Sequence, residues 1–132
     1  MAYLFDGMNV PGIKVSAPNE RILKILLSPE LGNTEKFTAL FSILSPENTI
    51  DSHTHESDEL MYVISGRGEA ICGDEKKEIS ADSIIWAPQN VKHFIKNNGD
   101  ETLKLLCIFI PPLKPSGVFI EAIEKARTYN LQ

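Results

Sequence analysis

The stretch His53–Gly66 reads HTHESDELMYVISG, and it decides what the rest of the chain is expected to form. The sequence has three histidines in 132 residues, and two of them stand here one residue apart. Residues i and i+2 of an extended strand point to the same side, so His53 and His55 direct their imidazoles toward one point. The polar residues 56–58 allow the chain to bend, and a bend brings the Glu59 carboxylate to the same point.

The third histidine, His93, lies in residues 91–97 (VKHFIKN), which read as another strand. Three imidazoles and a carboxylate form a mixed N/O donor set that suits one divalent transition metal ion, and iron, manganese, nickel, zinc and copper all fit it. Alternatively, the histidines are exposed to solvent or satisfied by hydrogen bonds within a core. We favour the metal site because every histidine of the chain falls within this pattern.

Short apolar runs separated by turn residues surround this stretch on both sides. Residues 21–28 (RILKILLS) and 36–44 (KFTALFSIL) precede it, and residues 83–88, 91–97 and 102–110 follow it. Such spacing indicates an antiparallel sandwich or barrel rather than alternating strands and helices. We therefore predict an all-β fold and a single domain over residues 1–132, with the barrel core at about residues 20–112.

The C-terminal end of the chain has a helical pattern. Phe119, Ile123 and Ala126 recur at helical spacing and predict a short helix over about residues 117–129, with Ser116 as its cap. We expect this helix to cover one edge of the barrel.

The strand at residues 103–110 is apolar on both faces. One face can fill the barrel, and the other must meet a second sheet or a partner subunit. A homodimer is the simplest explanation.

The composition excludes several classes of protein. A net charge of -5, with lysines and glutamates interspersed, argues against nucleic acid as a partner. No apolar run approaches the ~20 residues of a membrane-spanning helix. The first residues lack the pattern of a secretory signal, and Cys72 and Cys107 form no CxxC pair, so we expect a cytoplasmic protein that contacts no membrane.

Residues 53–66 and 82–97 together resemble the two sequence signatures of the cupin family. The first signature has two histidines one apart, then a glutamate after three residues and a glycine after six more. In the second segment, DSIIWAPQNVKHFIKN, the signature positions are occupied by Pro88, His93 and Asn97. This resemblance implies an antiparallel jelly-roll barrel. It also implies that the metal ligands are the four residues already named: His53, His55, Glu59 and His93.

The sequence departs from the family signatures at three glycines. Glu47, Asp82 and Asn90 stand where the signatures usually have glycine. Asp and Asn tolerate a positive φ, so the turns at Asp82 and Asn90 are expected to survive. Glu47 suits such a turn less well, although its neighbours Pro46 and Asn48 favour one.

Alternation along the strands predicts the walls of a substrate pocket. Met61 and Val63 follow Glu59 on its face, and Val91 and Ile95 accompany His93. If Lys104 faces solvent, the interior is lined by Leu103, Leu105, Cys107 and Phe109. The expected cavity is mainly apolar, which favours a small, modestly polar organic molecule bound directly to the metal. Arg21 and Lys24 are basic candidates whose direction the pattern leaves open.

These expectations allow three functions. The first is a small metal-dependent enzyme of the oxygenase, lyase, decarboxylase or isomerase type. The second is a non-catalytic module that binds or senses a small ligand through the metal. The third is a barrel in which the metal only adds stability.

Overall fold

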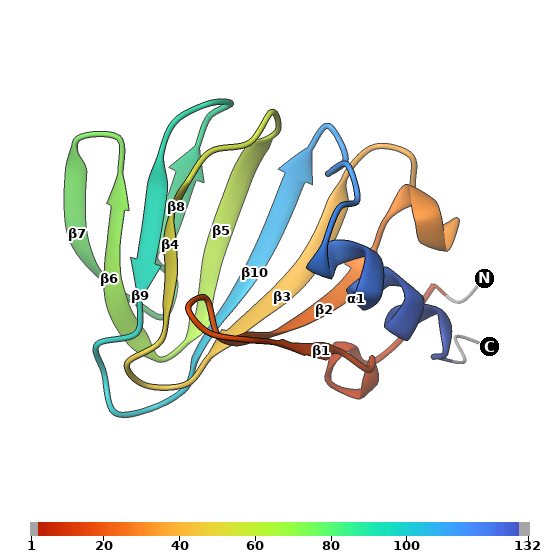
Figure 1. Cartoon of the computed structure of the whole chain (residues 1–132), viewed down its shortest axis with the longest axis horizontal. Helices are drawn as coiled ribbons and strands as arrows, with labels where there is room; N and C mark the ends of the chain where they lie inside the picture. Colours follow the sequence, from red (N-terminus) through yellow and green to blue (C-terminus); the bar gives the residue numbers. More distant parts are fainter. Residues whose placement is uncertain (1–2, 130–132) are drawn as a thin grey trace.

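The structure is a computed structural model that describes residues 3–129, and it consists of two β-sheets and one α-helix (Figure 1). Two short 3-10 helices cover Gly7–Asn9 and Pro29–Leu31, and the α-helix, α1, covers Val118–Arg127. The strands, in chain order, are β1 (Ile13–Val15), β2 (Arg21–Leu27), β3 (Thr38–Leu44), β4 (Thr49–His53), β5 (Asp58–Ser65), β6 (Arg67–Cys72), β7 (Glu75–Ser80), β8 (Ile84–Ala87), β9 (His93–Lys96) and β10 (Leu103–Ile110).

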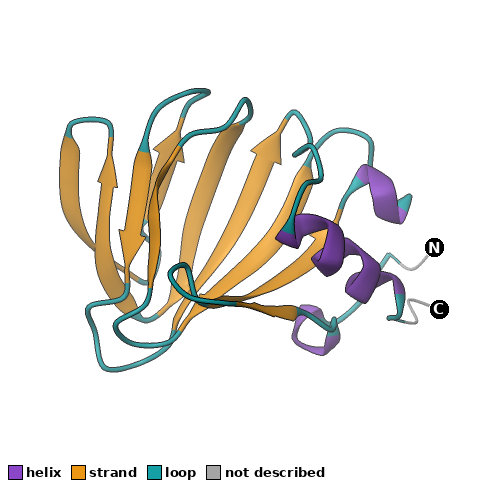
Figure 2. Cartoon of the chain, viewed as in Figure 1, coloured by secondary structure: helices purple, strands orange, loops and turns teal. Residues whose placement is uncertain are grey.

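The strands form two antiparallel layers (Figure 2). One sheet has six strands in the order β1-β2-β3-β10-β5-β8, and the other has four in the order β4-β9-β6-β7. Strands far apart in sequence are neighbours, as in the pairing of β10 with both β3 and β5. The all-β prediction is confirmed, with the antiparallel arrangement and the short C-terminal helix.

The core lies between the two sheets and follows the alternation of the strands. On β10, Leu103, Leu105 and Cys107 are at most 2% exposed, while Leu106 and Ile108 lie on the outer face. On β5, Glu59 and Met61 point inward in the same way. Every second residue therefore faces one interior, which places a carboxylate among apolar side chains.

Helix α1 packs against β2 and β1 at one end of the six-stranded sheet, as predicted (Figure 1). Its buried side chains are Ala122, Ile123 and Ala126. The predicted cap is wrong, because Gly117 occupies the N-cap position and no side chain bonds the first turn. Across residues 3–129, no helix has both the length and the apolar character needed to cross a bilayer.

All three residues that replace signature glycines have a positive φ. The values are 73° for Glu47, 73° for Asp82 and 65° for Asn90. Backbone hydrogen bonds hold these turns, with Asn90 N donating to His55 O at 3.0 Å and Glu47 N to Asn97 O at 2.9 Å. The turns keep their shape without glycine, including the one at Glu47, at a cost of roughly 1 kcal/mol each in backbone strain.

Asn97 is fully buried, and its side chain ties three backbone groups together. Its Nδ2 donates to Leu44 O at 2.9 Å and to Glu101 O at 2.8 Å, and its Oδ1 accepts from Gly99 N at 3.0 Å. These bonds fix the loop between β9 and β10 to the end of β3. Asn97 therefore supports the structure and lies outside the histidine cluster.

Replacing Asn97 with alanine should lower the free energy of unfolding by about 2–4 kcal/mol, because buried backbone groups lose their partners. Urea denaturation measures this change. Asn98→Ala is the matched control, since Asn98 is exposed, and it should cost less than about 0.5 kcal/mol. Equal unfolding midpoints for the two variants would contradict this role.

Candidate metal centre

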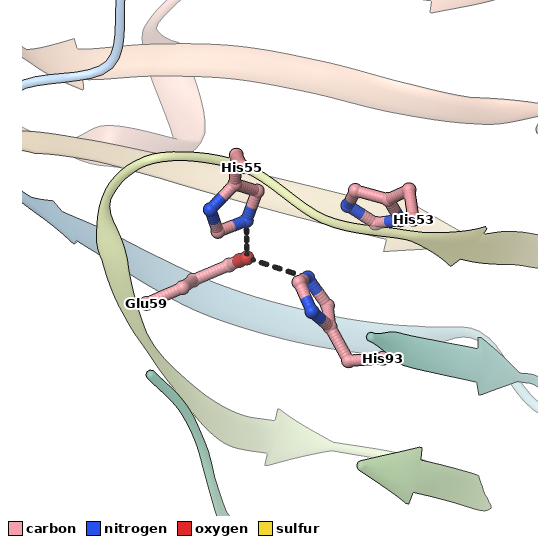
Figure 3. A group of neighbouring side chains, drawn as sticks. All are labelled: His53, His55, Glu59 and His93. Carbon is pink, nitrogen blue, oxygen red and sulfur yellow. Dashed lines mark hydrogen bonds and ion pairs between the residues drawn. The ribbon is translucent and has the colours of Figure 1, made fainter. Parts of the chain in front are cut away.

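The side chains of His53, His55, Glu59 and His93 come together in one cluster (Figure 3). Their candidate ligand atoms all lie within 4.8 Å of one another. Both sheets contribute, because His53 ends β4 and His93 begins β9, whereas Glu59 lies in β5. His55 lies in the loop between β4 and β5. The sequence pattern thus predicted which four side chains the fold assembles.

Each imidazole is held at its Nδ1 atom by a backbone carbonyl oxygen. The distances are 2.8 Å from His53 to Asp51 O, 3.0 Å from His55 to Ser57 O, and 3.0 Å from His93 to Val91 O. A carbonyl oxygen only accepts, so each Nδ1 must carry the proton. In a neutral ring, Nε2 then presents a lone pair. Such bonds orient metal-binding histidines and raise their basicity.

Glu59 Oε1 meets two of these Nε2 atoms. It lies 2.7 Å from His55 Nε2 and 3.1 Å from His93 Nε2 (Figure 3). If both rings are neutral, lone pairs face a carboxylate oxygen at contact distance, which is repulsive. A cation between them, either protons on the rings or a metal ion, removes this repulsion. The arrangement therefore requires positive charge at the point where the four residues converge.

The pKa shifts reflect burial and this contact. Burial acts to raise the pKa of Glu59, but the hydrogen bonds from His55 and His93 outweigh it and lower that pKa. Burial acts to lower the pKa of His93, but the hydrogen bonds to Glu59 and to Val91 O, together with the negative charge of Glu59, outweigh it and raise that pKa. The pKa of His53 is lowered, mainly by burial. These shifts favour the charged forms of both His93 and Glu59, because each charge stabilises the other across their contact.

The spacing fits a metal ion. Ligands about 2.1 Å from one ion lie about 3 Å apart when adjacent and about 4.2 Å apart when opposite. The Glu59 contacts match adjacent ligands, and the 4.8 Å limit requires side-chain movements below about 1 Å. Three nitrogen donors and one oxygen donor suit a divalent first-row ion, and the donor set does not distinguish among iron, manganese, nickel, zinc and copper.

A cavity of about 540 Å³ opens beside the cluster. His53 and His55 line it, and Phe109 packs edge-on to His55 with ring centroids 5.1 Å apart. A smaller space of about 30 Å³ lies deeper, lined by Glu59 and His93. His53 and Phe109 line both spaces, so the cluster stands where they meet.

Three of the predicted pocket residues, Met61, Ile95 and Cys107, line the deeper space. Val63 and Val91 do not. Val63 points inward but is fully buried in the core. Val91 precedes β9 in a turn closed by its N–H on Pro88 O at 3.0 Å, so strand alternation does not reach it, and it lines a separate depression.

Arg21, Ile50 and Phe119 also line both spaces, and the sequence pattern did not place them there. Arg21 shares the inner face of β2 with Leu23. Alternation along the strand could have oriented Arg21. However, residues 21–28 carry apolar side chains on both faces, so the pattern did not indicate which face meets solvent. Phe119 reaches the cavity from α1, which strand patterns do not describe.

Comparison with known proteins agrees with this architecture. The family model described as "Cupin domain" matches residues 40–109, more than half of the chain. This chain belongs to the cupin family. The match spans β3 through most of β10 and contains all four residues of the cluster.

Several curated proteins are similar in sequence. An uncharacterised protein of Methanocaldococcus jannaschii is 32% identical over 92 residues, which cover 69% of this chain and 74% of that protein. The polyketide synthase CurC of Streptomyces cyaneus is 32% identical over 111 residues, covering 80% and 71%. An H2HPP isomerase of Bacillus subtilis is 29% identical over 89 residues, covering 67% of this chain and 36% of that protein.

Solved structures share the fold. A protein described as a predicted oxalate decarboxylase from Thermotoga maritima has a TM-score of 0.74 at 20% identity, covering 82% of this chain and 98% of that chain. KdgF from a Halomonas species has a TM-score of 0.69 at 22% identity, covering 81% and 93%. At these identities the likeness concerns the fold alone.

Calorimetric titration with Mn²⁺ or Zn²⁺ should detect one metal ion per chain. His93→Ala removes one donor from the buried side of the cluster and should weaken binding at least tenfold. Glu56→Gln is the matched control, because Glu56 is an exposed carboxylate that pairs with Lys114 at 3.4 Å, and it should bind like the wild type. Equal affinity in all three proteins would contradict the assignment.

Proposed function

We propose that this cupin is a metal-dependent enzyme that acts on a small organic molecule bound at a divalent transition metal ion. The metal ligands would be His53, His55, Glu59 and His93. The observation that supports this best is that the four donors converge beside an open cavity of about 540 Å³. A metal placed only for stability needs no such access. The reaction would be of the oxygenase, lyase, decarboxylase or isomerase type.

The metal, when bound, would polarise a carbonyl or carboxylate oxygen of the substrate as a Lewis acid. The chain's own residues position and enclose that chemistry. The carbonyl oxygens of Asp51, Ser57 and Val91 hold the imidazoles in one tautomer. Phe109 covers one side of His55 and contributes an apolar wall that limits access of water.

The relatives support enzymatic function without selecting a reaction. The similar proteins include an isomerase and a protein described as a predicted decarboxylase. Cupin folds host many chemistries, so the site and not the fold must decide the substrate.

A non-catalytic ligand-binding module is the second candidate. The ionisable residues that line the deeper space are three of the metal ligands, Arg21 and Cys107. Burial raises the pKa of Cys107 well above its usual range, and Glu59 adds to the effect, so the thiol stays protonated. Within the described residues, no obvious general acid or base stands free there. Such a site can hold a ligand at the metal without transforming it.

We also propose that two copies of the chain associate through the outer face of the six-stranded sheet. That face exposes large apolar side chains, namely Ile22, Ile64, Ile84, Trp86 and Ile110, which are between 37% and 59% exposed. An apolar patch spread over four strands favours a protein partner, and a second copy offers a matching surface. Cys72 and Cys107 are free thiols, consistent with the cytoplasmic location proposed for this protein.

Metal-loaded protein should convert at least one member of a panel of small catechols, thiols and keto acids, followed by NMR and oxygen uptake. His93→Ala should reduce turnover at least a hundredfold, while Glu124→Gln, at an exposed carboxylate of α1 that lines neither space, retains it. Saturable binding of a panel member without turnover would favour the second candidate. Absence of both binding and turnover would contradict both functions.

Sedimentation equilibrium should show the wild-type protein as a dimer. Trp86→Glu places a charge within the apolar face and should shift the protein to monomers, whereas Ile120→Glu should leave it dimeric. Ile120 is a fair control because it is 49% exposed, like Trp86, but lies on α1. A monomeric wild type would refute the proposed interface.

A further inference from the structure

Arg21 is a basic side chain in the cavity that metal binding does not use. It is the first residue of β2 and shares the inner face of that strand with Leu23 and Ile25. It lines both the outer cavity and the deeper space, as His53 and Phe109 do. The guanidinium therefore stands between the cavity opening and the metal ligands.

The guanidinium is poorly satisfied by the protein. Its Nη1 donates to Asn19 O at 3.0 Å, and its Nε is buried without a hydrogen-bond partner. A guanidinium has five N–H donors in a planar fork, so most of its donor capacity is unused among the described residues. A buried N–H donor without a hydrogen-bond partner lowers the stability of the fold. Such donors are therefore unusual in proteins unless a ligand accepts the missing bond.

No carboxylate of residues 3–129 lies within 4.0 Å of a nitrogen of Arg21. Glu59 is the nearby anion within the site, and its Oε1 is already engaged by His55 and His93. Burial lowers the pKa of Arg21, and the negative charge of Glu59 opposes this effect without forming a pair. The positive charge is therefore inside the cavity and uncompensated by direct contact.

A divalent ion at the cluster would increase this excess of positive charge. With neutral imidazoles, the ion, Glu59 and Arg21 together would carry a net charge of about +2. In a partly buried cavity such a field attracts an anion strongly. The surrounding walls are apolar, since Ile50, Phe109 and Phe119 line both spaces.

We propose that Arg21 binds the carboxylate of the substrate, so that the protein acts on small monocarboxylic acids with an apolar body. This inference rests on the proposed function at the same site. The fork of Nε–H and an Nη–H matches the two oxygens of a carboxylate. The apolar walls receive the rest of the acid.

Phosphate offers the guanidinium the same oxygens, but the cavity favours a single negative charge. Asp51 stands at its opening and repels a dianion more than a monoanion. Glu56 and Lys114 also stand there, but they pair with each other at 3.4 Å and are both largely exposed. One half-buried cation and the Asp51 carboxylate at the opening therefore suit a monocarboxylate better than a phosphate ester.

Calorimetric titration with phenylacetate, phenylacetamide and inorganic phosphate tests this inference on both metal-free and Mn²⁺-loaded protein. Wild-type protein should bind phenylacetate at least tenfold more tightly than the amide or phosphate. Arg21→Met should lose roughly ten- to a hundredfold in affinity for phenylacetate and little for the amide. Arg21→Lys should recover only part of the loss, because an ammonium lacks the fork. Lys24→Met, on the outer face of the same strand, should bind like the wild type.

Two further readouts separate the outcomes. Mn²⁺ affinity of Arg21→Met should equal that of the wild type, so that failure of the metal site and failure of the carboxylate site are distinguished. The melting temperature of metal-free Arg21→Met should equal or exceed that of the wild type, because an unsatisfied buried group is removed. Equal phenylacetate affinity in wild type and Arg21→Met, tighter binding of phosphate than of phenylacetate, or a large loss of stability in Arg21→Met would each overturn the inference.

Discussion

Three backbone carbonyl oxygens determine how the histidine cluster works, because each fixes the proton of one imidazole on Nδ1. All three Nε2 atoms are then free to present lone pairs, and two of them meet Glu59 Oε1 at 2.7 and 3.1 Å. The carbonyls belong to Asp51, Ser57 and Val91, each two residues from the histidine that it holds. Local backbone geometry thus determines which nitrogen of each imidazole can bind a metal. The two sheets bring the three histidines and Glu59 together.

The sequence predicted the candidate site well where metal-binding residue types also had the spacing of one strand face. Alternation placed Glu59 and Met61 on one inner face, and the scarcity of histidine linked His93 to the distant pair. The same reasoning failed for Arg21, because its strand is apolar on both faces and gives no sign of which side is inside. It failed for Val91 because a turn, not a strand, precedes His93. Periodicity predicts which side chains point inward only within a regular strand or helix that has one apolar and one polar face.

Three turns show that the backbone conformation at a signature glycine does not depend on glycine itself. Glu47, Asp82 and Asn90 replace glycine, yet all three keep a positive φ. The fold therefore imposes the backbone conformation through hydrogen bonds such as Asn90 N to His55 O, and glycine only lowers its cost. This bond also joins the loop that carries His55 to the turn before His93. Geometry at the cluster survives the substitution because it is held by backbone contacts that any residue can make.

Helix α1 follows the last strand, yet Phe119 from this helix lines both spaces of the cavity, and Ser116 just before it lines the outer one. The pocket is therefore assembled from two parts of the chain: a barrel that supplies the donors, and a C-terminal segment that supplies part of the wall. Substitutions in this segment can therefore alter the shape of the pocket, while the barrel and its donors stay unchanged.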